Sequence, residues 1–173
     1  MRVIGGRFRS RKLKPVPGMM TRPTPDRLRE ALFNVLTPRI DGKVFLDGYA
    51  GTGAVAIEAL SRGARHAIVI ERNAEAVRVL RDNLESLGLG TEATVVRGAA
   101  VAKLRDYACD IAFLDPPYEQ SGDYAACLSI LAESDCGLAI AQHSSRVTLG
   151  ENYGRLTRRR VLKQGDNSLS FYE

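Results

Sequence analysis

Apolar and polar positions change their spacing at about residue 43. Before that point, apolar side chains over residues 24–37 recur every three or four positions, which predicts an amphipathic helix. We expect Thr24 to cap this helix and Pro25 to occupy its first turn, since both residue types favour those positions. The apolar stripe comprises Leu28, Ala31, Leu32, Val35 and Leu36.

After residue 43, short apolar runs alternate with helical patterns. The runs predict five buried strands, at residues 44–46, 67–70, 93–96, 111–114 and 138–141. Helices are expected between them over residues 53–62, 73–87 and 124–132, the second one capped by Asn73. Continuous apolar strands separated by helices indicate a parallel sheet that is covered on both faces.

Both ends of the chain depart from this alternation. Residues 2–14 alternate loosely around Gly5-Gly6 and predict a short basic β-hairpin. Residues 155–163 and 168–172 flank a turn and predict an antiparallel hairpin. The predicted fold is therefore α/β and Rossmann-like, with a mostly parallel seven-stranded sheet closed by the C-terminal hairpin. Residues 1–40 form a basic extension that packs on a domain of residues 41–173.

Composition places the chain among ordinary globular proteins. It has 173 residues, of which 45% are hydrophobic and 26% charged, enough for one domain with its own core. Its apolar runs are too short for a transmembrane helix, and no secretory signal is expected at its start. Cys109, Cys127 and Cys136 are widely spaced, so neither a disulfide framework nor a metal site is predicted, and a reducing cytoplasm is favoured.

Positive charge is concentrated near the N-terminus. The net charge of the whole chain is +5, yet residues 1–29 contain nine bases and a single acid. Such a segment favours binding to a polyanion. A second basic run, Arg158 to Arg160, fits either such a site or a solvated surface. The candidate nucleic-acid contacts are Arg7, Arg9, Arg11, Lys12, Arg22, Arg27 and Arg29.

A glycine-rich loop follows the first predicted strand of the sheet. Gly51, Gly53 and Ala56 match the G-x-G-x-x-G/A pattern, in which the glycines permit a tight turn and a close approach of backbone to ligand. Glu71 ends the next strand, 20 positions after Gly51, where a carboxylate can accept hydrogen bonds from ribose hydroxyls. The pattern predicts a site for a ligand that carries adenosine.

Asp47 narrows the choice of ligand. It ends the first strand immediately before the glycine loop, where its charge would repel a pyrophosphate. A ligand with an ammonium or sulfonium group suits that position better. S-adenosylmethionine is therefore favoured over NAD, and the chain also lacks an evident Tyr-x-x-x-Lys pair of a small oxidoreductase.

Asp115-Pro116-Pro117-Tyr118 follows the fourth strand of the sheet. The two prolines stiffen the backbone, so a carboxylate, a carbonyl and an aromatic ring are held in fixed relation. The Asp115 carboxylate and the Pro116 carbonyl can accept the N–H hydrogens of an exocyclic base amine, while Tyr118 can stack on the base. These four residues are the candidate catalytic group.

This tetrapeptide resembles motif IV of the amino-methyltransferases. The block Arg22-Pro23-Thr24-x-Asp26-Arg27-x-Arg29-Glu30-Ala31-Leu32-Phe33-Asn34 is similar to the N-terminal signature of the RsmD family, the bacterial 16S ribosomal RNA guanine-N2 methyltransferases. The loop around Gly51, the block Glu58 to Ala64 and the closing Gln164 to Tyr172 are also similar, so the resemblance spans almost the whole chain.

The resemblance implies a class I methyltransferase fold, S-adenosylmethionine as donor and a guanine N2 amine of 16S ribosomal RNA as acceptor. Asp47, Gly51 and Gly53 would hold the methionine end of the cofactor, and Glu71 its ribose. Where the family often has an acid after the third strand, this chain has Gly98-Ala99. The other implied cofactor contacts are Tyr49, Ala50, Arg72, Gly98 and Ala99.

Three alternatives remain beside this interpretation. The first is an amino-methyltransferase acting on DNA adenine or a protein side chain, although such enzymes usually have a longer N-terminal or recognition domain. The second is a non-catalytic RNA-binding module with a relic cofactor site, and the third is the NAD-dependent oxidoreductase. We expect a monomer that acts on ribosomal RNA, within a small-subunit particle, without a membrane or metal partner.

Overall fold

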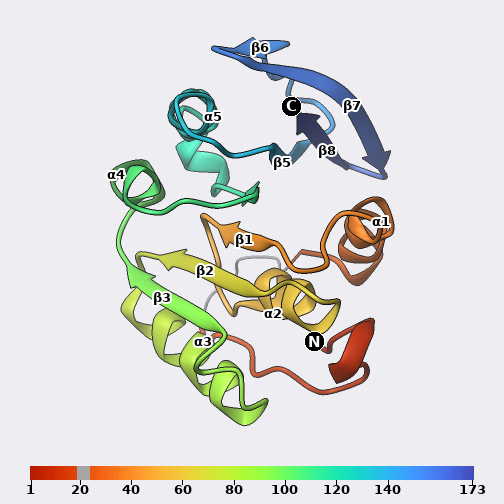
Figure 1. Ribbon diagram of the computed structural model, residues 1–173, viewed down its shortest axis with the longest axis vertical. Helices are drawn as coiled ribbons and strands as arrows, with labels where there is room; N and C mark the ends of the chain where they lie inside the picture. Colours follow the sequence, from red (N-terminus) through yellow and green to blue (C-terminus); the bar gives the residue numbers. More distant parts are fainter. Residues whose placement is uncertain (19–23) are drawn as a thin grey trace.

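Eight strands form one sheet in the computed structural model, which describes residues 1–18 and 24–173 (Figure 1). The strand order is β3-β2-β1-β4-β5-β8-β7-β6. The first five strands of this order run parallel, and the last three are antiparallel to their neighbours. The strands are β1 (Val44–Asp47), β2 (His66–Glu71), β3 (Ala93–Arg97), β4 (Ile111–Leu114), β5 (Leu138–Ser144), β6 (Asn152–Tyr153), β7 (Leu156–Gln164) and β8 (Asn167–Tyr172).

The mostly parallel sheet and its closing hairpin confirm the predicted fold class, with one strand more than expected. The additional strand β6 has two residues, Asn152 and Tyr153, which pair with Thr157 and Leu156 of β7. A strand this short shows no alternation of apolar and polar positions. The sequence therefore predicts only a loop there.

The helices cover both faces of the sheet. Helices α1, α2 and α3 pack on one face, whose side chains include Phe45, Val69 and Phe113. Helices α4 and α5 pack on the other, because alternate strand residues such as Leu46 and Leu114 point that way. The helices are α1 (Asp26–Leu36), α2 (Ala54–Ser61), α3 (Ala74–Ser86), α4 (Ala100–Lys103) and α5 (Asp123–Ala132).

Helix starts are only partly as predicted. Asn73 caps α3, with its Oδ1 accepting hydrogen bonds from the backbone N–H groups of Glu75 and Ala76, both at 2.9 Å. At α1 the capping residue is Pro25, and no side chain caps the helix. The predicted cap at Thr24 is therefore wrong, and its hydroxyl instead donates to the Asp115 carboxylate at 3.4 Å.

None of the helices in the described ranges combines the length and the apolar character that a membrane span requires.

The predicted hairpin over residues 2–14 forms as two short arms around a 3-10 turn at Gly6–Phe8, with an antiparallel bridge between Arg2 and Lys12. Main-chain hydrogen bonds also join the arms, among them Val3 N–H to the Arg11 carbonyl at 2.9 Å and Leu13 N–H to the Met1 carbonyl at 3.0 Å. The Glu58 carboxylate accepts hydrogen bonds from the N–H groups of Ile4 and Gly5, at 2.8 and 2.7 Å. The segment is thus attached to α2 as well as paired with itself.

Asn83 joins this segment to the glycine loop. Its side chain is buried in α3, and its Oδ1 accepts a hydrogen bond from the Lys14 N–H at 2.8 Å. Its Nδ2 donates to the carbonyl oxygens of Lys14 and Thr52, at 3.1 and 3.0 Å. One amide therefore satisfies the main chain of both the basic segment and the loop.

Candidate active site

Three carboxylates meet at one edge of the sheet. Asp47 ends β1, Glu71 ends β2, and Asp115 directly follows β4. Strand β1 lies between β2 and β4, and all three run parallel, so their carboxyl ends share one edge. This is the edge at which open parallel sheets bind their ligands.

The glycine loop has the backbone that its sequence predicts. Gly51 and Gly53 have φ values of +54° and +81°, which lie in the left-handed region that favours glycine. A Cβ on Gly53 would lie 3.2 Å from Cγ of Leu80, so close packing of α3 also disfavours a side chain there. The loop thereby brings its backbone N–H groups to the start of α2.

Glu71 supports this loop directly. One carboxylate oxygen accepts the Gly51 N–H at 2.9 Å, and the other accepts the Asn73 N–H at 2.8 Å. A carboxylate has about four acceptor positions, so each oxygen can still accept a hydroxyl hydrogen. Its predicted role toward a ribose is compatible with this geometry.

Asp47 is a buried acid whose negative charge is stabilised by few neighbouring groups. In the described part of the chain, its carboxylate accepts one hydrogen bond, from the Tyr49 N–H to Oδ1 at 3.2 Å. Burial raises the pKa of Asp47 to about 8, and the nearby acids Asp115 and Glu71 act in the same direction. A ligand with a positive group would supply the charge that this site lacks.

Tyr49 turns its hydroxyl away from the glycine loop toward α5. The hydroxyl donates a hydrogen bond to the Asp123 carboxylate at 2.7 Å and lies 3.4 Å from Sγ of Cys127. Burial raises the pKa of the Tyr49 phenol. The ring and backbone of Tyr49, rather than its hydroxyl, are therefore the parts available to a cofactor. Neighbouring Ala50 is buried.

The Asp115–Tyr118 loop combines a half-buried acid with an exposed ring. Burial raises the pKa of Asp115 to about 7, partly offset by the hydroxyl of Thr24. Pro116 is buried beneath the loop, whereas the Tyr118 side chain is 78% exposed. A planar base could therefore lie on Tyr118 while its amine reaches Asp115.

Gln120 and Asp123 are two side chains near this loop that the sequence analysis does not single out. With its amide oriented to suit its neighbours, Gln120 accepts hydrogen bonds from both terminal nitrogens of Arg72, at 2.5 Å, and donates to Asp123 at 3.2 Å. These contacts join the end of β2 to the segment after β4. Arg72 and Gln120 are 48 positions apart, so no local pattern indicates their contact.

The loop after β3 has no acidic group. Gly98 donates its N–H to the carbonyl of Glu71 at 3.1 Å, and Ala99 precedes α4 as its capping residue. Both residues lie beside the end of β2, as the prediction for a cofactor site requires. Across the described ranges, no group of three His, Cys, Asp or Glu side chains is arranged to hold a metal ion.

The predicted RNA contacts fall into three groups. Arg9, Arg11, Lys12 and Arg27 are exposed, and Arg7 is exposed with an ion pair to Glu92. Arg22 lies outside the described residues. Arg29 is a correction, because its side chain is fully buried and therefore cannot reach an RNA phosphate.

Arg29 has an internal role instead. Its guanidinium donates to the Asp26 carboxylate at 2.9 Å and to the Arg2 carbonyl at 2.6 Å, and its Nε lies 3.9 Å from a Glu58 oxygen. Burial lowers the pKa of Arg29, while Glu58 and Asp26 oppose that change. The residue therefore links α1, α2 and the N-terminal segment.

Comparisons with known proteins agree with this geometry. The family model described as "Conserved hypothetical protein 95" matches residues 1–173. A Bacillus subtilis relative named "Putative rRNA methyltransferase YlbH" is 37% identical, with 100% of this chain and 98% of the relative aligned. The Escherichia coli "Ribosomal RNA small subunit methyltransferase D" is 44% identical over 69% of this chain, and the match spans 61% of that relative.

A solved structure is similar over almost the whole chain. "Putative methyltransferase yhhF from Escherichia coli" has a TM-score of 0.87 and 32% sequence identity, covering 99% of this chain and 96% of that one. The similarity therefore includes the N-terminal segment and the C-terminal hairpin as well as the parallel sheet.

Proposed function

The chain belongs to the family of the ribosomal RNA small subunit methyltransferase D proteins, and from this premise we propose that it methylates the exocyclic N2 amine of a guanine in 16S ribosomal RNA. The observation that carries the proposal is the Asp115–Tyr118 loop, which lies at the same sheet edge as Asp47 and Glu71. The methyl donor is S-adenosylmethionine, whose sulfonium supplies an activated methyl group.

The residues at this edge fit that cofactor. Glu71 retains acceptor capacity for ribose hydroxyls, and the left-handed Gly51 and Gly53 allow backbone to approach the ligand. Asp47 is buried with no Lys or Arg within ion-pair distance among the described residues, so a cationic ligand satisfies it. Tyr49, Ala50, Arg72, Gly98 and Ala99 complete the proposed cofactor surroundings.

The acceptor amine is oriented by the loop after β4. A base amine is a weak nucleophile because its lone pair is delocalised into the ring. Asp115 and the carbonyl of Pro116 accept hydrogen bonds from its two N–H groups, which directs the lone pair toward the methyl group and stabilises the positive charge that develops on nitrogen. As the N–C bond forms, the S–C bond breaks and S-adenosylhomocysteine leaves, and the cationic amine then releases one proton. Pro117 fixes the backbone between them and Tyr118, which holds the base by stacking.

The exposed cations of the N-terminal segment bind RNA phosphates in this proposal. Four of these cations have exposed side chains: Arg9, Arg11, Lys12 and Arg27. Arg7 gives up its surface ion pair with Glu92 and contacts an RNA phosphate instead. Residues 1–40 act as this RNA-binding extension on the domain of residues 41–173. The substrate is 16S ribosomal RNA within a small-subunit particle, and the enzyme acts as a cytoplasmic monomer.

The proposal is tested by locating the transferred methyl group. The protein is incubated with S-adenosylmethionine labelled in its methyl group and with small-subunit particles that lack the modification, and the RNA is then digested to nucleosides. We expect the label in N2-methylguanosine. Label in another nucleoside, in DNA adenine or in ribosomal protein would support the alternative amino-methyltransferase, and absence of transfer would support a non-catalytic module.

Replacing Glu71 with alanine should weaken S-adenosylmethionine binding by roughly 1.5–3 kcal/mol, the usual contribution of a hydrogen bond to a charged group. The substitution also removes the acceptor of the Gly51 N–H, so the loop loses support along with the ribose contact. Calorimetric titration measures the change, with Glu75→Ala on the exposed surface of α3 as the control. Equal affinity in the Glu71 and Glu75 variants would remove Glu71 from the cofactor site.

Methyl transfer should depend on pH through Asp115. Burial raises the pKa of Asp115 to about 7, so its carboxylate is protonated at lower pH. The neutral carboxyl group no longer stabilises the positive charge that develops on the amine. The single-turnover rate at saturating cofactor should therefore fall about tenfold per pH unit below 7 and level off above it. Asp115→Asn should lose this inflection, and a wild-type profile that is flat between pH 5.5 and 8 would contradict the assignment.

A further inference from the structure

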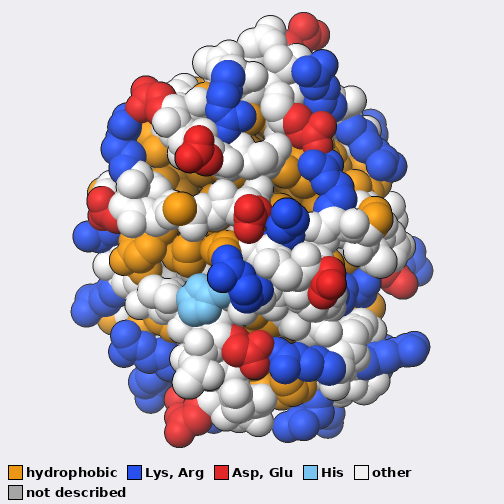
Figure 2. Space-filling view, in the orientation of Figure 1, with side chains coloured by type: hydrophobic (Ala, Val, Ile, Leu, Met, Phe, Trp, Pro, Cys, Tyr) orange, Lys and Arg blue, Asp and Glu red, His pale blue; other side chains and the backbone are white. Residues whose placement is uncertain are grey.

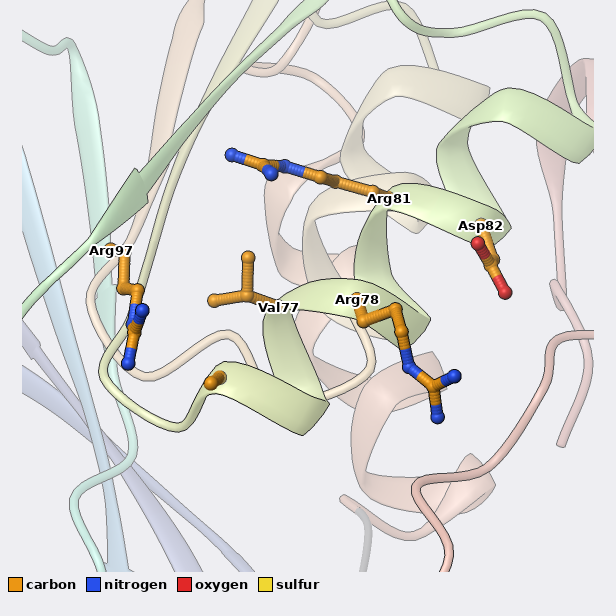
Figure 3. Close-up of a pocket in the computed structure, with 6 residues that line it drawn as sticks. Val77, Arg78, Arg81, Asp82 and Arg97 are labelled. Atoms are coloured by element: carbon orange, nitrogen blue, oxygen red, sulfur yellow. The ribbon is translucent and has the colours of Figure 1, made fainter.

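A second group of basic side chains lies outside the N-terminal segment, on α3 and the end of β3. Arg78, Arg81 and Arg97 line a pocket of about 280 Å³, together with Ala74, Val77 and Asp82. In Figure 3, the guanidinium of Arg81 lies above Val77 and that of Arg97 to its left, while Arg78 points away from Arg97. The pocket, called here the α3 pocket, therefore has an apolar floor between two guanidinium groups.

Positive charge in the α3 pocket is incompletely neutralised. Glu75 lies 3.6 Å from Arg78, and Asp82 is paired with Lys14 at 3.2 Å. Within the described ranges, no carboxylate lies at ion-pair distance from Arg81 or Arg97, and both side chains are exposed. Two such guanidinium groups at one pocket attract an anion.

The α3 pocket adjoins the basic N-terminal segment. Lys14 bonds Asp82 through its side chain and Asn83 through its main chain, so the segment lies along the same helix that forms the pocket. Figure 2 shows Lys and Arg side chains gathered at the lower left, where Figure 1 places α3 and β3. A polyanion bound to the segment can therefore continue over α3.

The pocket also lies close to the proposed reaction site. Arg97 is in register with Glu71 on the neighbouring strand, and α3 begins at Ala74, three positions after Glu71. The pocket and the residue proposed to hold the cofactor ribose therefore lie on adjacent strands. An RNA strand in the α3 pocket would remain near the carboxyl edge of the sheet.

We propose that the α3 pocket binds a backbone phosphate of the ribosomal RNA substrate, an inference that rests on the proposed function. Guanidinium groups suit this role because their planar donors match phosphate oxygens in pairs. The apolar floor of Ala74 and Val77 can accommodate the adjoining sugar. Contacts to phosphate and sugar position RNA without reading its sequence.

The test compares RNA affinity and its dependence on salt. Filter binding of a 16S ribosomal RNA transcript is measured between 50 and 300 mM KCl for the unchanged protein, Arg81→Gln, Arg97→Gln and the double variant. Arg105→Gln is the matched control, since Arg105 is an exposed arginine that pairs with Glu133 on the opposite face of the sheet. S-adenosylmethionine binding and methyl transfer to small-subunit particles are measured on the same samples.

We expect each substitution at the pocket to weaken RNA binding about threefold to tenfold and the double variant to reduce the log–log salt slope by about 1–2. Arg105→Gln and cofactor affinity should remain unchanged. RNA affinity and slope equal to those of the Arg105→Gln control would overturn the inference, as would a loss confined to cofactor binding, which would assign the pocket to the cofactor. Absence of methyl transfer by the unchanged protein would instead contradict the proposed function.

Discussion

Replacing Asp115 with alanine should slow single-turnover methyl transfer by roughly a hundredfold or more, while S-adenosylmethionine affinity stays close to that of the unchanged protein. The amine facing Asp115 is neutral before the reaction and positively charged after methyl transfer. The interaction with the carboxylate therefore strengthens along the reaction, and such an interaction lowers the barrier more than it aids binding.

Tyr118→Ala separates this effect from RNA binding. The exposed ring of Tyr118 should contribute about 1–3 kcal/mol by stacking on the base, so its loss should weaken RNA engagement as well as rate. Both variants are compared at saturating RNA and cofactor. If Asp115→Ala keeps a near-normal single-turnover rate, the loop after β4 is a structural turn and the proposed mechanism is wrong.

Replacing Glu58 with alanine should destabilise the fold by about 3–5 kcal/mol, as expected when one partner of a buried ion pair is removed. Glu58 is fully buried, bonds Arg62 Nε at 2.8 Å, accepts the N–H groups of Ile4 and Gly5, and lies near the buried Arg29. The substitution would leave the Arg29 charge without this carboxylate and those two N–H groups without acceptors.

Urea unfolding monitored by circular dichroism measures this loss. Glu75→Ala removes an exposed carboxylate 3.6 Å from Arg78 and should change stability by less than about 1 kcal/mol, since surface pairs contribute little. Adding Arg29→Met to Glu58→Ala should recover part of the stability, because the buried charge that Glu58 no longer neutralises is removed. A Glu58→Ala variant as stable as Glu75→Ala would show that the N-terminal segment does not depend on Glu58.

Sequence patterns predict an element well when the residues that determine it are neighbours in the chain. The four-residue run at β4 is apolar throughout, and its predicted bounds, residues 111–114, are those of the strand. The cap of α3 depends only on Asn73 and the two N–H groups that follow it. Helix α4 was missed because four residues without a side-chain cap give no periodic signal.

Contacts between distant residues could not be predicted in the same way. The sequence places Arg29 among the RNA-binding cations, because nothing local shows that it contacts Glu58 in another helix. The hydroxyl of Thr24 was assigned to a helix cap, although its partner Asp115 is 91 positions away. The sequence predicts the site residues that lie at the ends of strands. It does not predict the side chains, such as Thr24, that change the pKa of those residues.

The attachment of the N-terminal segment has a consequence for the order of events during synthesis. Its first residues leave the ribosome well before their partners, since Ile4 bonds Glu58, which is 54 positions later, and Lys14 bonds Asn83, which is 69 positions later. Until α2 and α3 are made, this basic stretch lacks its contacts with Glu58 and Asn83. The part of the enzyme proposed to hold ribosomal RNA thus takes its final shape only after more than 80 residues have been made.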